Sequence, residues 1–363
     1  MRHSPAIPML IALGLIFPTM TNAQKPPHGK PPQAAYDACK GKSRAATCQM
    51  QTPHGSMSGT CQTPPNVSEM VCVPKRHGQN MRPTGGQQQS NGNGQRQLRQ
   101  HTVTQSDGDL NLYPATERPI TQSEYSDHAS GTWRTIRTNG ISDHKTGTFP
   151  NSGNPHSISE QDFNIRVPKN PNKGNRAQTA RIIGWAFNGV PFEPGAGEFY
   201  LGNRQSGWQY EALSGAVRLG LDHNHAHVQP SGKYHYHGLP TLLLDQYNLS
   251  ASTHSPQIGW AADGFPIYAL YGQNEQGKIQ KLSASYRLKS GKRPAGGNHP
   301  GGYYDGTFTK DFEYVEGLGD LDACNGKWVQ TEEFPKGTYA YFLTENYPVI
   351  PRCLMGTYIA DTR

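Results

Sequence analysis

The sequence predicts a mainly β protein built from antiparallel sheets, with few short helices and a small disulfide-rich module near its N-terminus. Three observations support this fold class. The 363 residues include 41 glycines, 29 prolines and 18 tyrosines, a composition typical of turns and short strands. Aromatic and β-branched runs such as TWRTIRT, ARIIGWAF and GTYAYFLT alternate with Asn-Gly, Asp-Gly and proline-containing turns. Four cysteines lie close together before residue 75, which indicates the separate module.

The chain begins with the features of a secretory signal peptide over residues 1–23. A basic start and an apolar run from Met9 to Phe17 precede the small-residue pattern Thr-Asn-Ala, which ends at Ala23. No later segment approaches the ~18 apolar residues that span a bilayer. The sequence therefore predicts a periplasmic or secreted protein, cleaved near Ala23 and without a membrane span.

Residues 24–74 form the predicted cysteine-rich module. Its cysteines have 8, 12 and 10 residues between them and include no Cys-x-x-Cys, which disfavours a zinc site; they are Cys39, Cys48, Cys61 and Cys72. In an exported chain the expectation is two disulfides, for which three connectivities are open. The module is interpreted as structural.

Residues 75–124 are predicted to be a disordered linker, and residues 125–363 a β domain. The linker is rich in Gln, Gly and Asn and has no hydrophobic period, so burial cannot offset the entropy of ordering it. The β domain contains an apparent duplication. IGWAFNGVPFEP and LDHNHAHVQPSGKYHYHG, which begin at Ile183 and Leu221, recur in the same order as IGWAADGFPIYA and LDACNGKWVQTEEFPKGTYAYFLT, from Ile258 and Leu321. We predict two related halves, about 183–240 and 258–343.

The stretch HNHAHVQPSGKYHYHG carries histidines at every second position on both sides of Pro-Ser-Gly. Proline suits the first central position of a type I turn and glycine the left-handed position that follows, which predicts a three-residue hairpin loop. Directly paired side chains project to the same face. This loop pairs His227 with His235 and His225 with His237, and it leaves Tyr234 and Tyr236 on the other face. A four-residue loop would place Tyr234 opposite His227 and break the cluster.

Four imidazoles on one face indicate a metal site. They would repel one another if protonated, and a divalent cation removes that cost. Ligation by nitrogen alone suits Zn(II) or Cu(II). The alternative is an exposed polar strand face, or histidines satisfied separately by nearby Asp or Tyr groups.

The second half is not expected to bind metal in this way. It has no histidine at the matching positions, which carry Asn325, Lys327, Ala340 and Phe342, while its tyrosines survive as Tyr339 and Tyr341. Its two cysteines, Cys324 and Cys353, are predicted to form a third disulfide.

Further residues near these motifs could assist the site. His144 and His254 could complete it or hydrogen-bond its ligands, or could be plain surface histidines, and His223 continues the alternation upstream. Asp222 and Asp263 could be carboxylates near the metal, but turn capping is the favoured interpretation.

Long strings of residues 139–363 resemble the YHYH-domain family of exported bacterial proteins. They include NGISDHKTGTFPNSGNP, IGWAFNGVPF, AHVQPSGKYHYHG, IGWAADGFPIY, GDLDACNGK and GTYAYFLTENYPVIPRC. The cysteine-rich module also resembles an N-terminal segment of some members. The family is defined by its motif, and the resemblance implies no particular activity.

Three functions fit the sequence. The first is a metal-dependent enzyme in which His227, His235 and His237 are ligands, His225 is a fourth ligand or orienting group, and water takes an open position. No motif for a particular reaction is present. The second is a metal carrier or sensor without catalysis. The third is an extracellular structural or interaction module without metal. The net charge of +7 is spread along the chain, which argues against a nucleic-acid partner and leaves a periplasmic or extracellular ligand.

Overall fold

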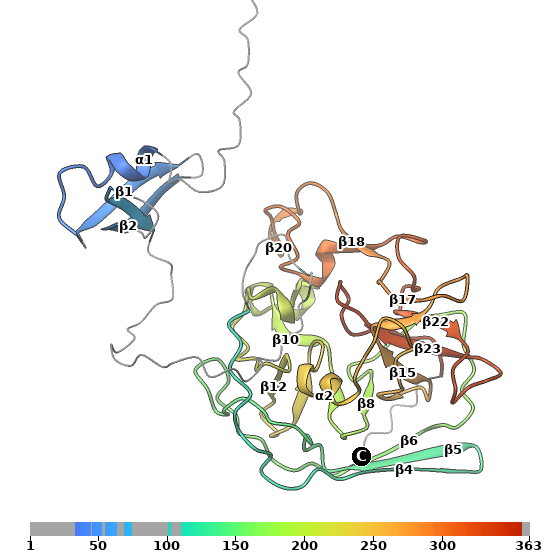
Figure 1. Cartoon of the computed structure of the whole chain (residues 1–363). Helices are drawn as coiled ribbons and strands as arrows, with labels where there is room; N and C mark the ends of the chain where they lie inside the picture. The colour runs from blue at the N-terminus through green and yellow to red at the C-terminus, as the bar shows by residue number, and fades with distance from the viewer. Residues whose placement is uncertain are drawn as a thin grey trace, which may run out of the picture. The chain divides into compact units, whose positions relative to one another are not determined.

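The structure is a computed structural model that describes residues 33–44, 46–52, 55–63, 69–74, 101, 103 and 110–357. The predicted signal peptide and most of the predicted linker (75–100, 102 and 104–109) lie outside the described residues. The chain divides into two compact units, residues 1–93 and 94–363, which we describe separately (Figure 1). Every helix within the described ranges is too short or too polar to cross a membrane.

The first unit is a small three-stranded antiparallel sheet with one short helix. Its elements are α1 (Gln33–Asp37), β1 (Thr47–Thr52), β2 (Gly55–Gln62) and β3 (Val71–Pro74). Two disulfides hold it together, Cys39–Cys61 and Cys48–Cys72, which selects one of the three connectivities. The sulfurs of Cys39, Cys48 and Cys72 lie near one another. Because all of them are in disulfides, they offer no thiolate to a metal.

The second unit is centred on an eight-stranded sheet. In spatial order its strands are β12 (Ala226–Val228), β13 (Tyr234–Tyr236), β9 (Pro191–Phe192), β8 (Gly184–Ala186), β14 (Gly259–Ala261), β15 (Pro266–Ala269), β23 (Thr338–Leu343) and β22 (Gly326–Val329).

The pairing order repeats outward from the centre of this sheet. β8 and β14 are antiparallel and pair Trp185 with Trp260. On each side follow a hairpin partner (β9 or β15), a parallel strand (β13 or β23) and an antiparallel strand at the edge (β12 or β22). The sheet is mixed because the long segments between β9 and β13 and between β15 and β23 allow the crossovers that parallel neighbours require. This order supports two related halves, which stay a prediction.

Glycine in both copies of the IGW motif is explained by close contact at the sheet centre. A Cβ at Gly184 would lie 2.3 Å from the Trp260 carbonyl oxygen, and one at Gly259 would lie 2.2 Å from that of Trp185. Both distances are far below van der Waals contact. The two glycines therefore allow β8 and β14 to approach.

Smaller sheets and short helices surround the central sheet. The three-stranded sheet comprises β4 (Tyr125–Ser130), β5 (Trp133–Thr138) and β6 (Phe163–Pro168). The two-stranded pairs are β10 (Gly195–Phe199) with β11 (Gln209–Glu211), β16 (Tyr271–Gln273) with β17 (Ile279–Lys281), β18 (Tyr286–Leu288) with β21 (Phe312–Tyr314), β19 (Ala295–Gly296) with β20 (His299–Pro300), and β7 (Gln178–Thr179) with β24 (Cys353–Leu354). The helices are α2 (Thr241–Gln246), η1 (Tyr200–Gly202), η2 (Arg204–Ser206), η3 (Ala212–Ser214) and η4 (Thr309–Asp311).

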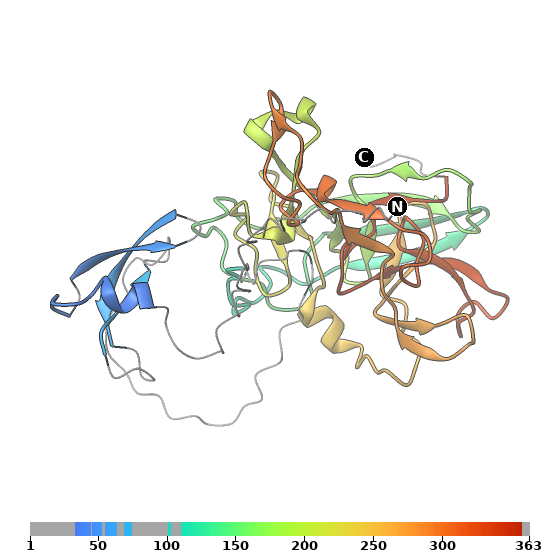
Figure 2. The same cartoon turned by 90° about the horizontal axis from the view of Figure 1, so that it is seen from above.

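Two of these pairs project together from the second unit. Figure 2 shows the β10–β11 and β19–β20 segments side by side. Trp208, which directly precedes β11, joins them: its ring packs edge-on against His299 of β20 with centroids 6.3 Å apart, and its Nε1–H donates to the His299 Nδ1 (3.2 Å). Residues of the β10–β11 segment line part of a pocket in this unit.

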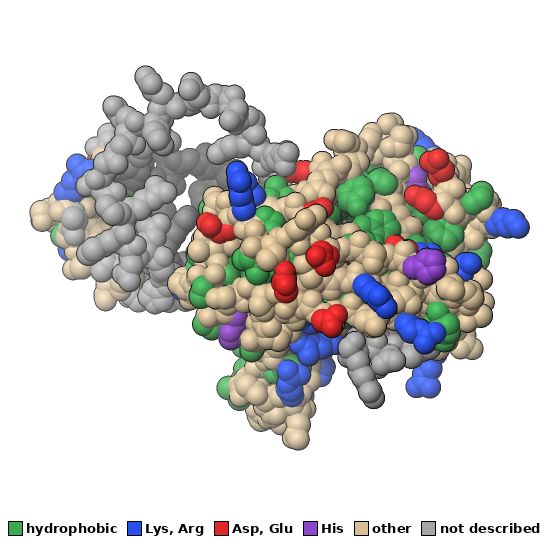
Figure 3. All heavy atoms as spheres, turned by 90° about the horizontal axis from the view of Figure 1, so that it is seen from below, with side chains coloured by type: hydrophobic (Ala, Val, Ile, Leu, Met, Phe, Trp, Pro, Cys, Tyr) green, Lys and Arg blue, Asp and Glu red, His purple; other side chains and the backbone are tan. Residues whose placement is uncertain are grey.

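The main core lies around the central sheet and includes residues from the β4–β6 sheet. Ile136, Ile165 and Val167 belong to the same buried cluster as Trp185 and Phe192. Val103 is also in this cluster, although the sequence placed it in the linker. On the face of the molecule drawn in Figure 3, acidic and basic side chains both occur, rather than a continuous basic surface.

The predicted disulfide between Cys324 and Cys353 is present and ties the loop before β22 to β24. Replacing both cysteines with alanine should lower the free energy of unfolding by about 2–4 kcal/mol, because the cross-link restricts the unfolded chain. Urea denaturation of the oxidised protein and of this variant measures the difference. An unchanged midpoint would show that the bond contributes nothing to stability.

Candidate metal centre

The histidine hairpin has the predicted register. β12 and β13 pair His227 with His235, and the Gln229 N–H donates to the Lys233 carbonyl across the loop (3.0 Å). Gly232 closes the turn with φ of 82°. A Cβ there would also lie 1.9 Å from the Ser159 Oγ, so both the backbone and the available space require glycine. The three-residue loop is therefore confirmed.

Three histidines of this hairpin converge. The ring centroids of His227, His235 and His237 are 4.6–4.7 Å apart in all three pairs. One ring nitrogen of each lies within 4.8 Å of the others. This spacing brings the three imidazoles close enough together that they could hold a single ion.

Hydrogen bonds orient two of the three rings. The Nδ1 of His227 is 2.8 Å from the Leu219 carbonyl, and the Nδ1 of His235 is 3.2 Å from the Lys233 carbonyl. A carbonyl accepts, so each Nδ1 carries the proton and each Nε2 keeps a free lone pair. This arrangement matches metal-binding histidines, whose second nitrogen is held by a backbone carbonyl or a carboxylate.

His237 lacks such an orienting hydrogen bond, and its surroundings are the strongest indication that the triad binds a metal. Its side chain is 1 % exposed, and neither ring nitrogen makes a hydrogen bond of good geometry among the described residues; the backbone of Pro194 is close enough only to raise its pKa slightly against the larger effect of burial. Buried polar groups are nearly always paired, and an unpaired one is costly. A metal ion would satisfy one nitrogen of this ring.

The three rings are held neutral. Burial lowers the pKa of His227, and burial together with the neighbouring imidazoles lowers the pKa of His235 and of His237 well below the usual value. Neutral imidazole is the form that binds metal.

The structure does not bring His225 into this group. Its carbonyl accepts from the His237 N–H (2.8 Å), so the register is kept, but its backbone is left-handed, with φ of 53°. The side chain consequently leaves the histidine face. Its Nδ1 lies 2.8 Å from the Leu239 carbonyl, and its ring packs edge-on against His101 at 4.0 Å. The sequence had assigned His101 to the linker.

His144 and Asp222 lie on the tyrosine face of the hairpin. The Nε2 of His144 is 2.6 Å from the hydroxyl of Tyr236. Tyr234 donates to Asp222 (2.7 Å), which also accepts from the Gly147 N–H (2.8 Å). Asp222 therefore anchors the hairpin, in line with the turn interpretation.

The other predicted auxiliary residues also lie outside the group. His223 is half-buried, and its backbone N–H donates to the Tyr113 carbonyl. His254 contacts Tyr268 in the second half, with ring centroids 4.8 Å apart. Asp263 accepts from the hydroxyl of Tyr341 (2.6 Å) and serves the turn after β14.

The β22–β23 hairpin shows the same scaffold without the histidines. Asn325 has φ of 54° and accepts from the Phe342 N–H, as His225 does from His237. Lys327 pairs with Ala340, as His227 does with His235. Ala340 and Phe342 lie in an apolar cluster. The histidines are therefore not required to form a hairpin of this kind.

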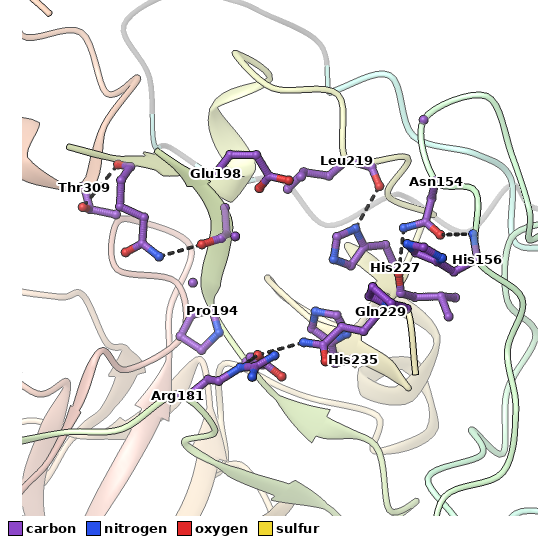
Figure 4. Close-up of a pocket in the computed structure, with 18 of the residues that line it drawn as sticks. Asn154, His156, Arg181, Pro194, Glu198, Leu219, His227, Gln229, His235 and Thr309 are labelled. Carbon is purple, nitrogen blue, oxygen red and sulfur yellow. Dashed lines mark hydrogen bonds and ion pairs between the residues drawn. The ribbon is translucent and has the colours of Figure 1, made fainter. Parts of the chain in front are cut away.

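The triad lies beside a pocket of about 830 Å³. His227 and His235 are part of its lining (Figure 4), whereas His237 is not. Arg181, Glu193 and Glu198 contribute to the walls. These residues could not be predicted from the sequence, because they come from separate segments with no spacing that links them to the histidines.

A comparison with protein-family models decides the family. The model described as YHYH protein matches residues 164–356, more than half of the chain. The chain belongs to the YHYH family. The YHYH match includes both hairpins and the triad, whereas His144, His156 and the cysteine-rich unit lie before it. No curated protein and no solved structure gave a match.

Proposed function

We propose that this YHYH protein binds a divalent transition metal through His227, His235 and His237, and that the metal position opens to the pocket for a water molecule or substrate. The observation that carries the proposal is the buried ring of His237. Its nitrogens make no hydrogen bond of good geometry among the described residues, and it completes a triangle with two rings whose Nε2 lone pairs are free.

Three histidines with an open position suit catalysis better than storage. Structural zinc sites are closed by four protein ligands, whereas catalytic sites keep one position free. The fourth predicted histidine, His225, is held elsewhere, and the space beside the triad is a pocket. A bound metal would polarise a substrate oxygen or lower the pKa of a bound water.

The chain's own residues would orient this centre. The carbonyls of Leu219 and Lys233 fix the tautomers of His227 and His235. Lys233 in turn forms an ion pair with Glu193 (2.6 Å), which fixes the end of β13. All-nitrogen ligation favours Zn(II) or Cu(II). The disulfides are typical of an oxidising compartment and support the proposal that the protein is exported.

The open position can be tested with cobalt. The full chain, stripped of metal and loaded with Co(II), should take up one ion, and azide should change its visible absorption because an exchangeable position is free. His156→Ala is the control, since His156 lines the pocket outside the triad and should leave the azide response unchanged. A cobalt spectrum insensitive to azide would contradict an open site, and failure to bind cobalt would contradict the metal site.

A further inference from the structure

The pocket beside the triad has an excess of positive charge. Four arginines and two glutamates line it: Arg181, Arg204, Arg218, Arg352, Glu193 and Glu198. Arg352 is balanced by the fully buried Glu211 at 2.6 Å. Glu193 faces two cations at once, Lys233 and Arg181. The other three arginines of the lining are therefore only partly compensated or not compensated at all.

Arg181 has two guanidinium nitrogens that are available to a ligand at the triad end of the pocket. Figure 4 shows it near His235. Its Nε binds Glu193, and its two terminal nitrogens have no hydrogen-bond partner among the described residues. The side chain is 71 % exposed and lines the pocket, so these donors are accessible to a ligand.

Arg218 lies on the His227 side. It directly precedes Leu219, whose carbonyl holds His227. It donates to the hydroxyls of Ser152 (2.6 Å) and Tyr113 (3.3 Å) and has no carboxylate partner among the described residues. Arg204 packs over the Phe199 ring at 5.1 Å and has no carboxylate partner among the described residues.

Of the two glutamates that line the pocket, only Glu198 is free to offset the charge of these arginines. Glu198 is exposed and forms no ion pair within the described residues. A metal at the triad would add two further positive charges. A cleft with this balance concentrates anions, and guanidinium groups bind carboxylate and phosphate oxygens through paired N–H donors.

We propose that the pocket binds a small anionic molecule whose carboxylate or phosphate oxygens pair with Arg181, Arg204 and Arg218. A volume of about 830 Å³ is in the range of small-molecule sites. The inference rests in part on the proposed metal site. The arginines would bind the oxygens of the anion, and the neighbouring metal would be the second group that contacts the ligand.

Calorimetric titration tests the inference with malonate and inorganic phosphate as anionic probes and malonamide as the neutral analogue of malonate. The metal-loaded protein should bind both anions and not malonamide. Arg181→Gln and Arg218→Gln should each weaken anion binding by about tenfold or more, the value of one charge-assisted hydrogen bond. Arg287→Gln is the matched control, because Arg287 pairs with Glu313 and is not part of the pocket lining. The Arg287→Gln variant should bind malonate and phosphate with the same affinity as the unsubstituted protein.

The outcomes separate this inference from the metal site. If the protein holds metal but binds malonamide as tightly as malonate, the anion pocket is wrong and the metal site stands. Full anion affinity in the Arg181→Gln, Arg218→Gln double variant would likewise overturn it. If no metal binds but the arginine-dependent affinity remains, the metal site fails and the anion pocket survives.

Discussion

Replacing His237 with alanine is expected to reduce the metal content of the purified protein from one ion per chain to nearly none. His237 is buried, and neither of its ring nitrogens makes a hydrogen bond of good geometry among the described residues. Loss of a hydrogen bond behind a ligand already costs about 10–100-fold in metal affinity, and loss of the ligand itself should cost more. Mass spectrometry of bound metals after dialysis measures the effect.

His223→Ala is the matched control for this prediction. His223 belongs to the same alternating run but lies outside the triad, so its variant should retain the metal. Because His237 is buried, each variant is also checked by circular dichroism for a native fold. A folded His237→Ala protein with full metal content would refute the role of this residue.

Replacing Asp222 with alanine should be the most damaging change to the hairpin scaffold. The carboxylate is fully buried and accepts from the Tyr234 hydroxyl and from the N–H groups of Gly147 and Asn224. Its loss leaves at least these three buried donors unpaired, at about 1–3 kcal/mol each. We expect the free energy of unfolding to fall by at least about 3 kcal/mol, measured by urea denaturation.

Two further variants sharpen this test. Asp222→Asn keeps one acceptor oxygen and should lose less stability, while remaining folded enough for a metal assay. Asp322→Ala removes the matching carboxylate of the second hairpin, which is only half-buried, and should cost less than Asp222→Ala. Equal stability of Asp222→Ala and the unsubstituted protein would show that the tyrosine face does not depend on this anchor.

The sequence was sufficient to predict the hairpin and the convergence of three of its four candidate ligands. The order Pro-Ser-Gly sets the loop, the loop sets the register, and the alternation of a strand places His227, His235 and His237 on one face. These steps use only local geometry. The mainly β fold follows in the same way from short strand runs and frequent turns.

The position of His225 required information that the alternation does not contain. Alternation assumes extended backbone, and residue 225 is left-handed. A signal was present in the second half, where Asn325 occupies the matching position, because asparagine is enriched in left-handed backbone. The pocket arginines could not be predicted, since tertiary contacts alone bring their segments together.

Anomalous diffraction from crystals of the metal-loaded protein, recorded at the absorption edge of the bound metal, tests the central claim most directly. The account predicts one peak bonded to a ring nitrogen of each of His227, His235 and His237, at about 2.0–2.1 Å for zinc, with its remaining position facing the pocket. A peak at any other residues, or one closed by a fourth protein ligand, would contradict it.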